Sequence, residues 1–242
     1  MAENTPMATR LMDVYHRFYA AYGPQHWWPG EGPFEVIVGA ILTQSAAWAN
    51  VEKALADMRA AGCWSFEAVH RLPEAELAQL VRSSGYFNAK ARKLKAFAAH
   101  VAVNYPGDLD ENLDRFFSKP TGPLREELLS IHGIGEETAD DILVYAAGKP
   151  SFVIDTYTRR IMDRMGMAPA PGKTRPKYGD YQAVFHDHLS HDDNQPGDTR
   201  LFNEFHALWD RHAKEACAKT PRCEGCCLLD ICATGQSNTP KS

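Results

Sequence analysis

Four cysteines near the C-terminal end carry the clearest chemical signal in the sequence. The segment reads Cys217-x5-Cys223-x2-Cys226-x5-Cys232 and holds five of the chain's six cysteines, with Cys227 a bystander beside a candidate ligand. In a reducing compartment such a cluster indicates metal or iron–sulfur ligation before disulfides. Four thiolates on one short loop suit a [4Fe–4S] cluster. Zinc binds four thiolates equally well, although its structural sites more often show two Cys-x2-Cys knuckles, so both ligands stay open at this point.

Asp155 is the second residue whose position suggests chemistry. It follows the apolar residues Val153 and Ile154 and begins a predicted helix. An aspartate at that position commonly caps the helix, and taken alone this is the stronger interpretation. A partly buried carboxylate in a cleft can also act on a sugar or a water molecule.

A glycine turn that ends about 20 residues before Asp155 could bind an anion. Gly133-Ile-Gly135 joins two predicted helices, and the two glycines permit a tight turn with close backbone approach. The second helix would then present peptide N–H groups and the positive end of its dipole to an anion such as a DNA phosphate. An ordinary helical hairpin explains the same residues about equally well.

Two further segments contain side chains that often contact nucleic acids. Residues 82–95 hold five basic residues and no acidic one, with Tyr86 and Phe87 between them. Such a patch can hold a backbone and stack on bases, although a run of charge is usually a solvated helix face. Trp27, Trp28 and Trp48 could form a pocket wall, although aromatic residues are most often core.

The composition limits the classes of protein that could carry these residues. The 242 residues are 44% hydrophobic and 24% charged, which excludes a disordered or collagen-like chain and allows a sizeable core. The 26 basic against 31 acidic residues argue against coating nucleic acid along the whole surface, but not against local contact. We find no long apolar run and no secretory signal, so we expect a cytoplasmic protein that does not contact membranes.

The elements that position these residues are predicted to be helical almost throughout. Apolar residues recur at helical spacing, and only residues 152–154 suggest a strand, which is too short to build a sheet. The sequence therefore predicts an all-α fold. The expected helices include residues 74–81, 88–103, 124–131, 138–147, 155–165, 181–189 and 201–216, with Ser65 as a cap of a short helix.

Together these features resemble the helix-hairpin-helix DNA glycosylases of the endonuclease III superfamily, over about residues 34–232. The parts follow in the family's order: Ile41-Leu-Thr-Gln-Ser45, Ser84-Gly-Tyr-Phe-Asn-Ala-Lys90, the hairpin, the aspartate helix and the cysteine loop. Trp27-Trp28-Pro29, the Ile-Leu-Thr-Gln segment and Ser84-Gly85 are most similar to the endonuclease III-like 3-methyladenine DNA glycosylases. That similarity implies removal of alkylated purines, although known members of that type lack the cysteine loop.

The resemblance also implies an architecture and a partner. A six-helix barrel would span residues 30–147 and carry the hairpin. Residues 1–29 and 148–242 would form a terminal helical domain with the [4Fe–4S] loop, in which Lys219 and Arg222 match basic residues of a phosphate-contacting loop. The expected partner is double-stranded DNA that contains damaged bases, bound by a monomer.

Residue roles follow from the same resemblance. Asp155 would be the catalytic carboxylate. Gln44 would fill the space that an extruded nucleotide vacates, and Tyr86 would wedge the opposite strand. The remaining expected roles are backbone anchoring by the amides of Gly133 and Gly135, further DNA contacts by Asn88, Lys90 and Thr138, a base pocket of Trp27, Trp28 and Trp48, and cluster ligation by Cys217, Cys223, Cys226 and Cys232.

Glu137 distinguishes two reaction types. Bifunctional members of the superfamily carry a lysine at this position, and that lysine forms a Schiff base with the sugar. A carboxylate cannot form an imine, so we predict a monofunctional glycosylase. Glu137 could simply stabilise the helix by interacting favourably with its dipole, or it could assist catalysis as a second carboxylate. The alternatives are a glycosylase or glycosylase/lyase for oxidised or mismatched bases, and a non-catalytic protein that binds damaged DNA.

Overall fold

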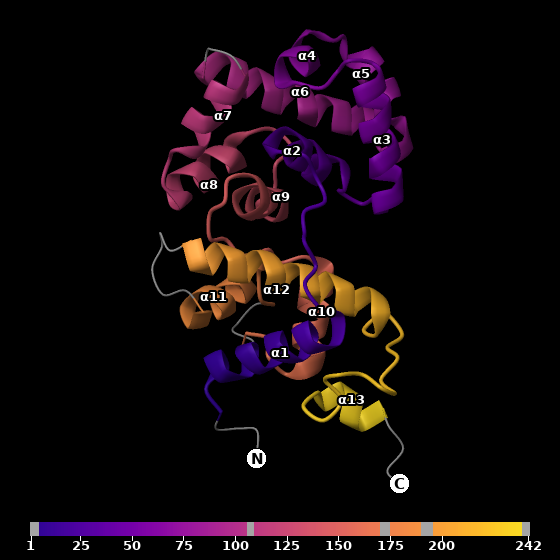
Figure 1. Cartoon of the computed structure of the whole chain (residues 1–242), viewed down its shortest axis with the longest axis vertical. Coiled ribbons are helices and arrows are strands. Elements are labelled where there is room, and N and C mark those ends of the chain that lie inside the picture. The colour runs from indigo at the N-terminus through magenta and orange to yellow at the C-terminus, as the bar shows by residue number, and fades with distance from the viewer. Residues whose placement is uncertain (1–4, 106–108, 170–174, 190–195, 239–242) are drawn as a thin grey trace. The chain divides into compact units, whose positions relative to one another are not determined.

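The computed structural model describes residues 5–105, 109–169, 175–189 and 196–238, with no side chains described for residues 109–111 and 196–198. Every regular element in these ranges is helical, which confirms the all-α prediction (Figure 1). Among these helices, none has both the length and the apolar character that crossing a lipid bilayer requires.

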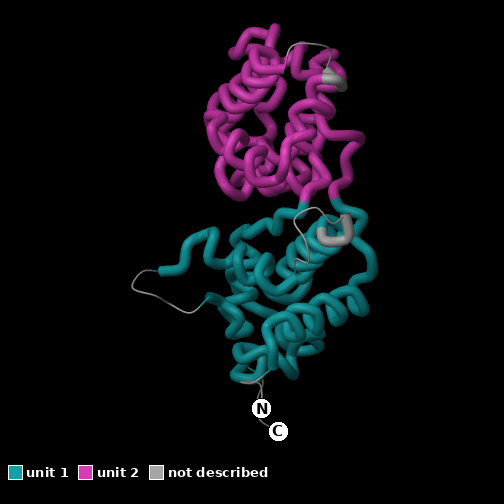
Figure 2. The backbone as a smooth tube through the Cα atoms, turned by 90° about the vertical axis from the view of Figure 1, so that its left-hand side faces the viewer, with its two compact units in different colours: residues 1–27, 150–242 teal, residues 28–149 magenta. Residues whose placement is uncertain are grey.

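The chain divides into two compact units, which Figure 2 colours separately. Unit 1 comprises residues 1–27 and 150–242, and unit 2 comprises residues 28–149. The boundaries expected from the sequence, 29/30 and 147/148, lie two residues away in each case. One consequence is that the adjacent residues Trp27 and Trp28 belong to different units.

Unit 2 is organised around its first helix, which is unusually apolar. This helix, α2 (Pro33–Leu42), is buried from Phe34 to Leu42 apart from Glu35, and it packs against α3, α6, α9 and η2. A helix that is apolar all round must be enclosed by its neighbours. Those neighbours and the other helices of the unit are α3 (Trp48–Ala60), α4 (Phe66–Arg71), α5 (Glu74–Leu80), η1 (Arg82–Ser84), α6 (Phe87–Asn104), α7 (Leu109–Phe117), α8 (Thr121–Ser130), α9 (Glu136–Asp141) and η2 (Ile142–Ala146).

Local signals set two helix ends in unit 2, and one of them is the predicted cap at Ser65. Ser65 caps α4, since its Oγ accepts the peptide N–H of Ala68 at 3.1 Å. Gly62 follows α3 with φ +69°, a conformation that glycine adopts without strain. The helix α6 packs against α2, α4, α5, α7 and η1, so its side chains reach several parts of the unit.

Unit 1 has an aromatic core between helices from both ends of the chain. Its helices are α1 (Met7–Tyr22), α10 (Thr156–Met165), α11 (Tyr178–Leu189), α12 (Pro196–Glu215) and α13 (Ala233–Asn238). The helix α1 packs against α11 and α12, and α10 packs against α12 and α13. The fully buried aromatic side chains of this core are Phe18, Phe152, Phe185, Phe202, Phe205 and Trp209.

The apolar segment before Asp155 is extended but pairs with side chains instead of a strand. The peptide N–H of Phe152 donates to His186 Nε2 at 3.0 Å, and that of Ile154 donates to the Tyr178 hydroxyl at 3.1 Å. Both partners lie on α11. Because its backbone polar groups are satisfied in this way, the segment can be buried as it leads into α10.

Candidate functional site

The glycine turn between α8 and α9 forms the predicted hairpin in unit 2. Ile131 and Ile134 are each 5% exposed and anchor the turn in the core. Gly133 has φ +87°, and a Cβ there would lie 2.2 Å from Lys93 Cγ, so both backbone and packing require glycine. Gly135 has an ordinary φ of −94°, and a Cβ there would meet no atom within 4 Å. The space beside Gly135 is therefore open to an approaching ligand.

Gln44, in the turn between α2 and α3, is held against this hairpin. Its Nε2 donates to Thr138 Oγ1 at 2.8 Å and to the Gly133 carbonyl at 3.3 Å. Its Oε1 accepts a hydrogen bond from Lys93 Nζ. Thr138 is 5% exposed, so its hydroxyl fixes Gln44 from inside the unit, and this burial disfavours the predicted contact of its side chain with DNA.

The segment after η1 contains one strongly exposed aromatic side chain. Tyr86 is 75% exposed and adopts a left-handed backbone with φ 45° and ψ 31° at the start of α6. Such a conformation costs a non-glycine residue on the order of 1–3 kcal/mol and persists only where its surroundings impose it. Asn88, two residues further along, is also exposed. These two side chains are therefore accessible for the predicted contacts with DNA.

The basic side chains of α6 are used within the protein. Lys90 is 2% exposed, and its Nζ donates to the carbonyls of Leu42 at 2.7 Å and Ser84 at 2.6 Å. Lys95 Nζ donates to carbonyls at the end of α4, including that of Leu72 at 2.8 Å. The expectation that Lys90 contacts DNA directly is not supported by this geometry, because its ammonium is enclosed. The sequence offers two interpretations of residues 82–95, a patch that binds DNA and a solvated helix face. Neither interpretation describes Lys90 and Lys95.

Trp28 and Trp48 meet in unit 2 and share an aromatic cluster with a residue that the sequence analysis missed. The ring centroids of Trp28 and Trp48 lie 5.3 Å apart at 85°, and those of Trp28 and Tyr145 lie 5.5 Å apart at 53°. Gly39 of α2 makes room for Trp28, since a Cβ there would lie 3.0 Å from the indole. Trp48 Nε1 donates to Glu52 Oε1 at 3.0 Å, which places a carboxylate beside the cluster. Trp27 belongs to unit 1.

Tyr145 reaches this cluster from a π-helical turn. Its segment, η2, continues directly from α9. Such turns are rare and frequently occur at functional sites, because the extra residue changes the direction of the side chains that follow. A helical pattern read at 3.6 residues per turn cannot place a residue on such a turn, which explains why the sequence analysis did not identify it.

Glu137 lies in the first turn of α9 and its side chain is exposed. Glu136 beside it is exposed as well. Two carboxylates at a helix N-terminus interact favourably with the helix dipole. The structure thus accounts for Glu137 as a dipole partner, and its catalytic role stays a prediction.

Asp155 caps α10 in unit 1. Its Oδ1 accepts the peptide N–H of Thr158 at 2.7 Å, and its side chain is half-buried. The capping hydrogen bond fixes the carboxylate at the end of the buried segment 152–154. His206 on α12 is buried, and burial lowers its pKa, while the negative charge of Asp155 opposes that shift. His206 therefore lies within electrostatic range of Asp155.

The four predicted cluster ligands line one pocket in unit 1. Cys217, Cys223, Cys226 and Cys232 all contribute to its wall, and Cys227 does not. Among the described residues, no group of three or more His, Cys, Asp or Glu side chains is arranged to hold a metal ion. The cysteines are therefore gathered around a common space without converging on one point. This cysteine cluster is consistent with a [4Fe–4S] cluster, in which each thiolate binds a different iron.

Cations and polar groups surround this pocket. Arg164 Nη1 donates to Cys217 Sγ at 3.0 Å, and His212 Nε2 lies 3.9 Å from Cys226 Sγ. The Tyr22 hydroxyl lies 2.8 Å from the other ring nitrogen of His212 and fixes the imidazole. Burial alone would raise the pKa of Cys217, but hydrogen bonds from His212 and Arg164 lower it overall. The surroundings thus favour the thiolate, the form that ligates iron, at Cys217, whereas the hydrogen bond with Cys227 and burial raise the pKa of Cys226 to about 12.

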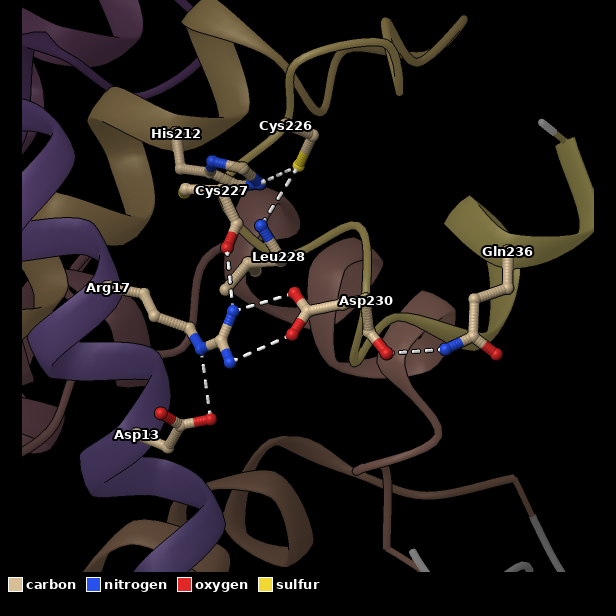
Figure 3. Close-up of polar contacts among 8 residues, drawn as sticks. All are labelled: Asp13, Arg17, His212, Cys226, Cys227, Leu228, Asp230 and Gln236. Carbon is tan, nitrogen blue, oxygen red and sulfur yellow. Dashed lines mark hydrogen bonds and ion pairs between the residues drawn. The ribbon is translucent and has the colours of Figure 1, made fainter.

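Arginines attach the cysteine loop to the helices around it. Arg17 of α1 donates through Nη1 to the Cys227 carbonyl at 3.2 Å and to Asp230 at 2.7 Å (Figure 3). Arg222 donates through Nη2 to the Lys214 carbonyl at 3.0 Å, at the end of α12. The expected phosphate contact by Arg222 is therefore not favoured, because its guanidinium caps a helix. Lys219 is exposed.

Comparisons with known proteins agree with this arrangement. A family model described as "HhH-GPD superfamily base excision DNA repair protein" matches residues 38–178. The "Putative DNA repair glycosylase MJ1434" of Methanocaldococcus jannaschii is 37% identical over 222 residues, which cover 92% of this chain and 95% of that protein.

Two solved structures extend the comparison. The H. pylori 3-methyladenine DNA glycosylase (MagIII) bound to 1,N6-ethenoadenine is 25% identical with a TM-score of 0.70, covering 87% of this chain and 98% of that one. A non-covalent endonuclease III–DNA complex is 20% identical with a TM-score of 0.77, covering 98% and 100%. The helical architecture described above is therefore the fold of endonuclease III.

Proposed function

The chain belongs to the HhH-GPD superfamily of base excision DNA repair proteins, and on that premise we propose that it is a monofunctional DNA glycosylase that releases cationic, N-alkylated purines. The observation that carries the choice of substrate is the aromatic cluster of Trp28, Trp48 and Tyr145 with Glu52 beside it. Its π-faces and carboxylate suit a flat ligand that bears positive charge.

Alkylation at N3 or N7 makes a purine positively charged, and it also makes the purine a better leaving group. A cation over an aromatic face gains about 0.5–2 kcal/mol, which a neutral purine of the same shape does not. The similarity to a 3-methyladenine DNA glycosylase that holds 1,N6-ethenoadenine supports a pocket for a modified purine. Selectivity would then combine charge recognition with the easier extrusion of a damaged nucleotide.

Asp155 would perform the chemical step. As the glycosidic bond breaks, the electrons of that bond leave with the purine and the sugar develops positive charge. The Asp155 carboxylate, fixed by its capping hydrogen bond to Thr158, would stabilise that charge or activate the attacking water. The products would be a free base and an abasic site.

The proposal excludes a lyase step through Glu137. By the resemblance to the superfamily, this residue occupies the position at which bifunctional members carry a lysine. A carboxylate has no amine with which to attack the sugar. The strand should therefore stay unbroken after base release.

The cysteine-lined pocket would hold a [4Fe–4S] cluster through Cys217, Cys223, Cys226 and Cys232. Since cluster binding couples to folding, Cys226→Ser should lose most bound iron and visible absorbance and lower the melting temperature. Cys227→Ser is the matched control, because Cys227 is adjacent in sequence but does not line the pocket. Equal iron loss in both variants would contradict the ligand assignment.

A base-release panel tests the substrate class. Duplexes with a methylated, an oxidised, a deaminated or a mismatched base are incubated with the protein, and the freed base is identified by mass. We expect release of 3-methyladenine or 7-methylguanine. Release confined to oxidised or mismatched bases would overturn the proposal, and binding without any release would indicate a non-catalytic protein.

A second candidate function is a glycosylase for oxidised or mismatched bases. The cysteine-lined pocket favours it, because the 3-methyladenine enzymes that the tryptophan segment resembles lack a cysteine loop. The aromatic cluster and Glu137 disfavour it. The same panel separates the two candidates.

A further inference from the structure

Lys90 is a buried ammonium group whose two acceptors are peptide carbonyls. Its side chain is 2% exposed, and its Nζ donates to Leu42 at 2.7 Å and to Ser84 at 2.6 Å. Burial lowers the pKa of Lys90 to about 8, and the nearby charge of Lys93 adds to that shift. Burying a charge is costly, and an apolar side chain of similar length would fill the same space at less cost. The position therefore calls for a reason beyond packing.

The two carbonyls stand at the bases of two exposed turns. Leu42 is the last residue of α2, immediately before Thr43, Gln44 and Ser45. Ser84 is the last residue of η1, immediately before Gly85 and Tyr86. One side chain thus joins the backbone of the turn that carries Gln44 to the backbone of the turn that carries Tyr86.

Both turns contain a non-glycine residue in the left-handed conformation. Ser45 has φ 54° and Tyr86 has φ 45°, and His26 is the one other such residue in the described part of the chain. Backbone of this kind holds its shape only when contacts on either side enforce it. Lys90 supplies such a contact at the base of each turn, and the negative end of the α2 dipole helps to hold its charge there.

From this geometry we infer that Lys90 is a positioning residue that fixes the Gln44 and Tyr86 turns relative to each other, so that both side chains enter damaged duplex DNA together. The inference rests on the proposed function, because that function assigns contacts with DNA to Gln44 and Tyr86. Gln44 would occupy the vacated space while Tyr86 separates the opposite strand. Loss of the link would let one turn shift without the other.

The chain offers a matched control on the same helix. Lys95 of α6 also donates from its Nζ to peptide carbonyls at a helix end, among them Val69 at 3.2 Å and Leu72 at 2.8 Å. These carbonyls belong to the end of α4, which carries neither Gln44 nor Tyr86. Lys90→Met and Lys95→Met therefore remove similar interactions, and only the first loosens the two turns.

The test compares base release from two substrates. Extrusion from a duplex costs a few kcal/mol, whereas a single strand has no pairing to break. In single-turnover assays on a 3-methyladenine oligonucleotide, Lys90→Met should slow release from the duplex about 10-fold and from the single strand less than about 2-fold, where 10-fold corresponds to about 1.4 kcal/mol. Lys95→Met should leave the duplex-to-single-strand ratio unchanged. Equal losses on both substrates in Lys90→Met would overturn the inference.

Hydrogen exchange provides a readout that does not depend on activity. Lys90→Met should increase amide exchange in residues 43–46 and 85–88 together, while Lys95→Met should do so near residues 69–72. Unchanged amide exchange in Lys90→Met, either in residues 43–46 or in residues 85–88, would overturn the inference. If Lys90→Met does not fold, Lys90→Gln, which keeps a donor without the charge, should show the same pattern more weakly. Wild-type protein that releases no base would refute the proposed function, and the exchange result would still decide the role of Lys90.

Discussion

The two units use cationic side chains that bind backbone carbonyls for different purposes. In unit 2, Lys90 and Lys95 bind helix-end carbonyls and leave the surface to Tyr86, Gln44 and the open space at Gly135. In unit 1, Arg164 and Arg17 hold the cysteine loop, and Arg164 also reaches a cysteine sulfur.

Neither set of cations is placed as a DNA-coating patch, in keeping with a net charge of −5. Unit 2 holds the parts that fit recognition of a nucleotide. Unit 1 holds Asp155 and the cysteine-lined pocket. We therefore expect substitutions in unit 2 to impair recognition of the nucleotide, and substitution of Asp155 in unit 1 to impair the chemical step.

The largest effect is expected at Asp155 in unit 1. Asp155→Asn should slow single-turnover base release by about 10²–10³-fold, the usual cost of removing one group that stabilises a transition state. Asparagine also caps helices well, so the melting temperature should stay close to that of the wild type. Base release at the wild-type rate by a folded variant would remove Asp155 from the mechanism.

In unit 2, Gly135→Ala should weaken DNA binding without unfolding the protein. The backbone at Gly135 is not left-handed and a Cβ there meets no neighbouring atom, so the added methyl group blocks only an incoming ligand. The Kd for damaged duplex should rise about 10-fold, the scale of a lost hydrogen bond to a charged group. Gly122→Ala, at an equally open site in α8, is the control. Unchanged affinity in Gly135→Ala would place the phosphate contact elsewhere.

Trp48→Leu should distinguish cationic from neutral bases. Loss of the indole should slow release of 7-methylguanine about 2- to 30-fold, the span of 0.5–2 kcal/mol for a cation over an aromatic ring, with a smaller effect on hypoxanthine. Trp64→Leu is the control, because the ring contacts of Trp64 are with Phe34 and Arg59. Equal slowing of both bases by Trp48→Leu would argue against charge recognition.

The last prediction concerns stability and pH in unit 2, not activity or binding. The folded pKa of Lys90, about 8, lies below its ordinary value of 10.5, so between these values the unfolded chain binds more protons. The penalty of the buried charge is fully present below pH 8 and disappears as the pH rises towards 10.5. The free energy of unfolding of the wild type, measured relative to Lys90→Met, should therefore increase over this range. A constant difference would show that Lys90 is not held in an unfavourable site.

Several features could be predicted from local sequence. The helical periodicity gave the all-α fold, the position of Asp155 before a polar helix start gave its capping role, and the joint order of motifs led to the superfamily. Gly133 and Gly135 were identified as a hairpin because two glycines between helices leave few other conformations.

Other features depend on contacts that no local pattern encodes. Tyr145 reaches Trp28 from a π-helical turn, and Lys90 is buried where the carbonyl of Leu42, distant in sequence, and that of Ser84 both face it. A basic run looks the same in sequence whether its charges face solvent, DNA or the protein's own helix ends. Arg222 shows the same limit, because its hydrogen bond to the Lys214 carbonyl of α12 does not follow from its position between two cysteines, and its contact with phosphate stays a prediction.

Borohydride trapping tests the central claim, that Asp155 releases the base without a lysine, most directly. The wild-type protein is incubated with duplex DNA that contains a methylated purine, reduced with borohydride and separated on a denaturing gel, alongside the mass of the freed base. We predict a free methylated purine, an intact abasic strand and no covalent protein–DNA band above background. A strong covalent band, with strand cleavage in step with base release, would contradict it.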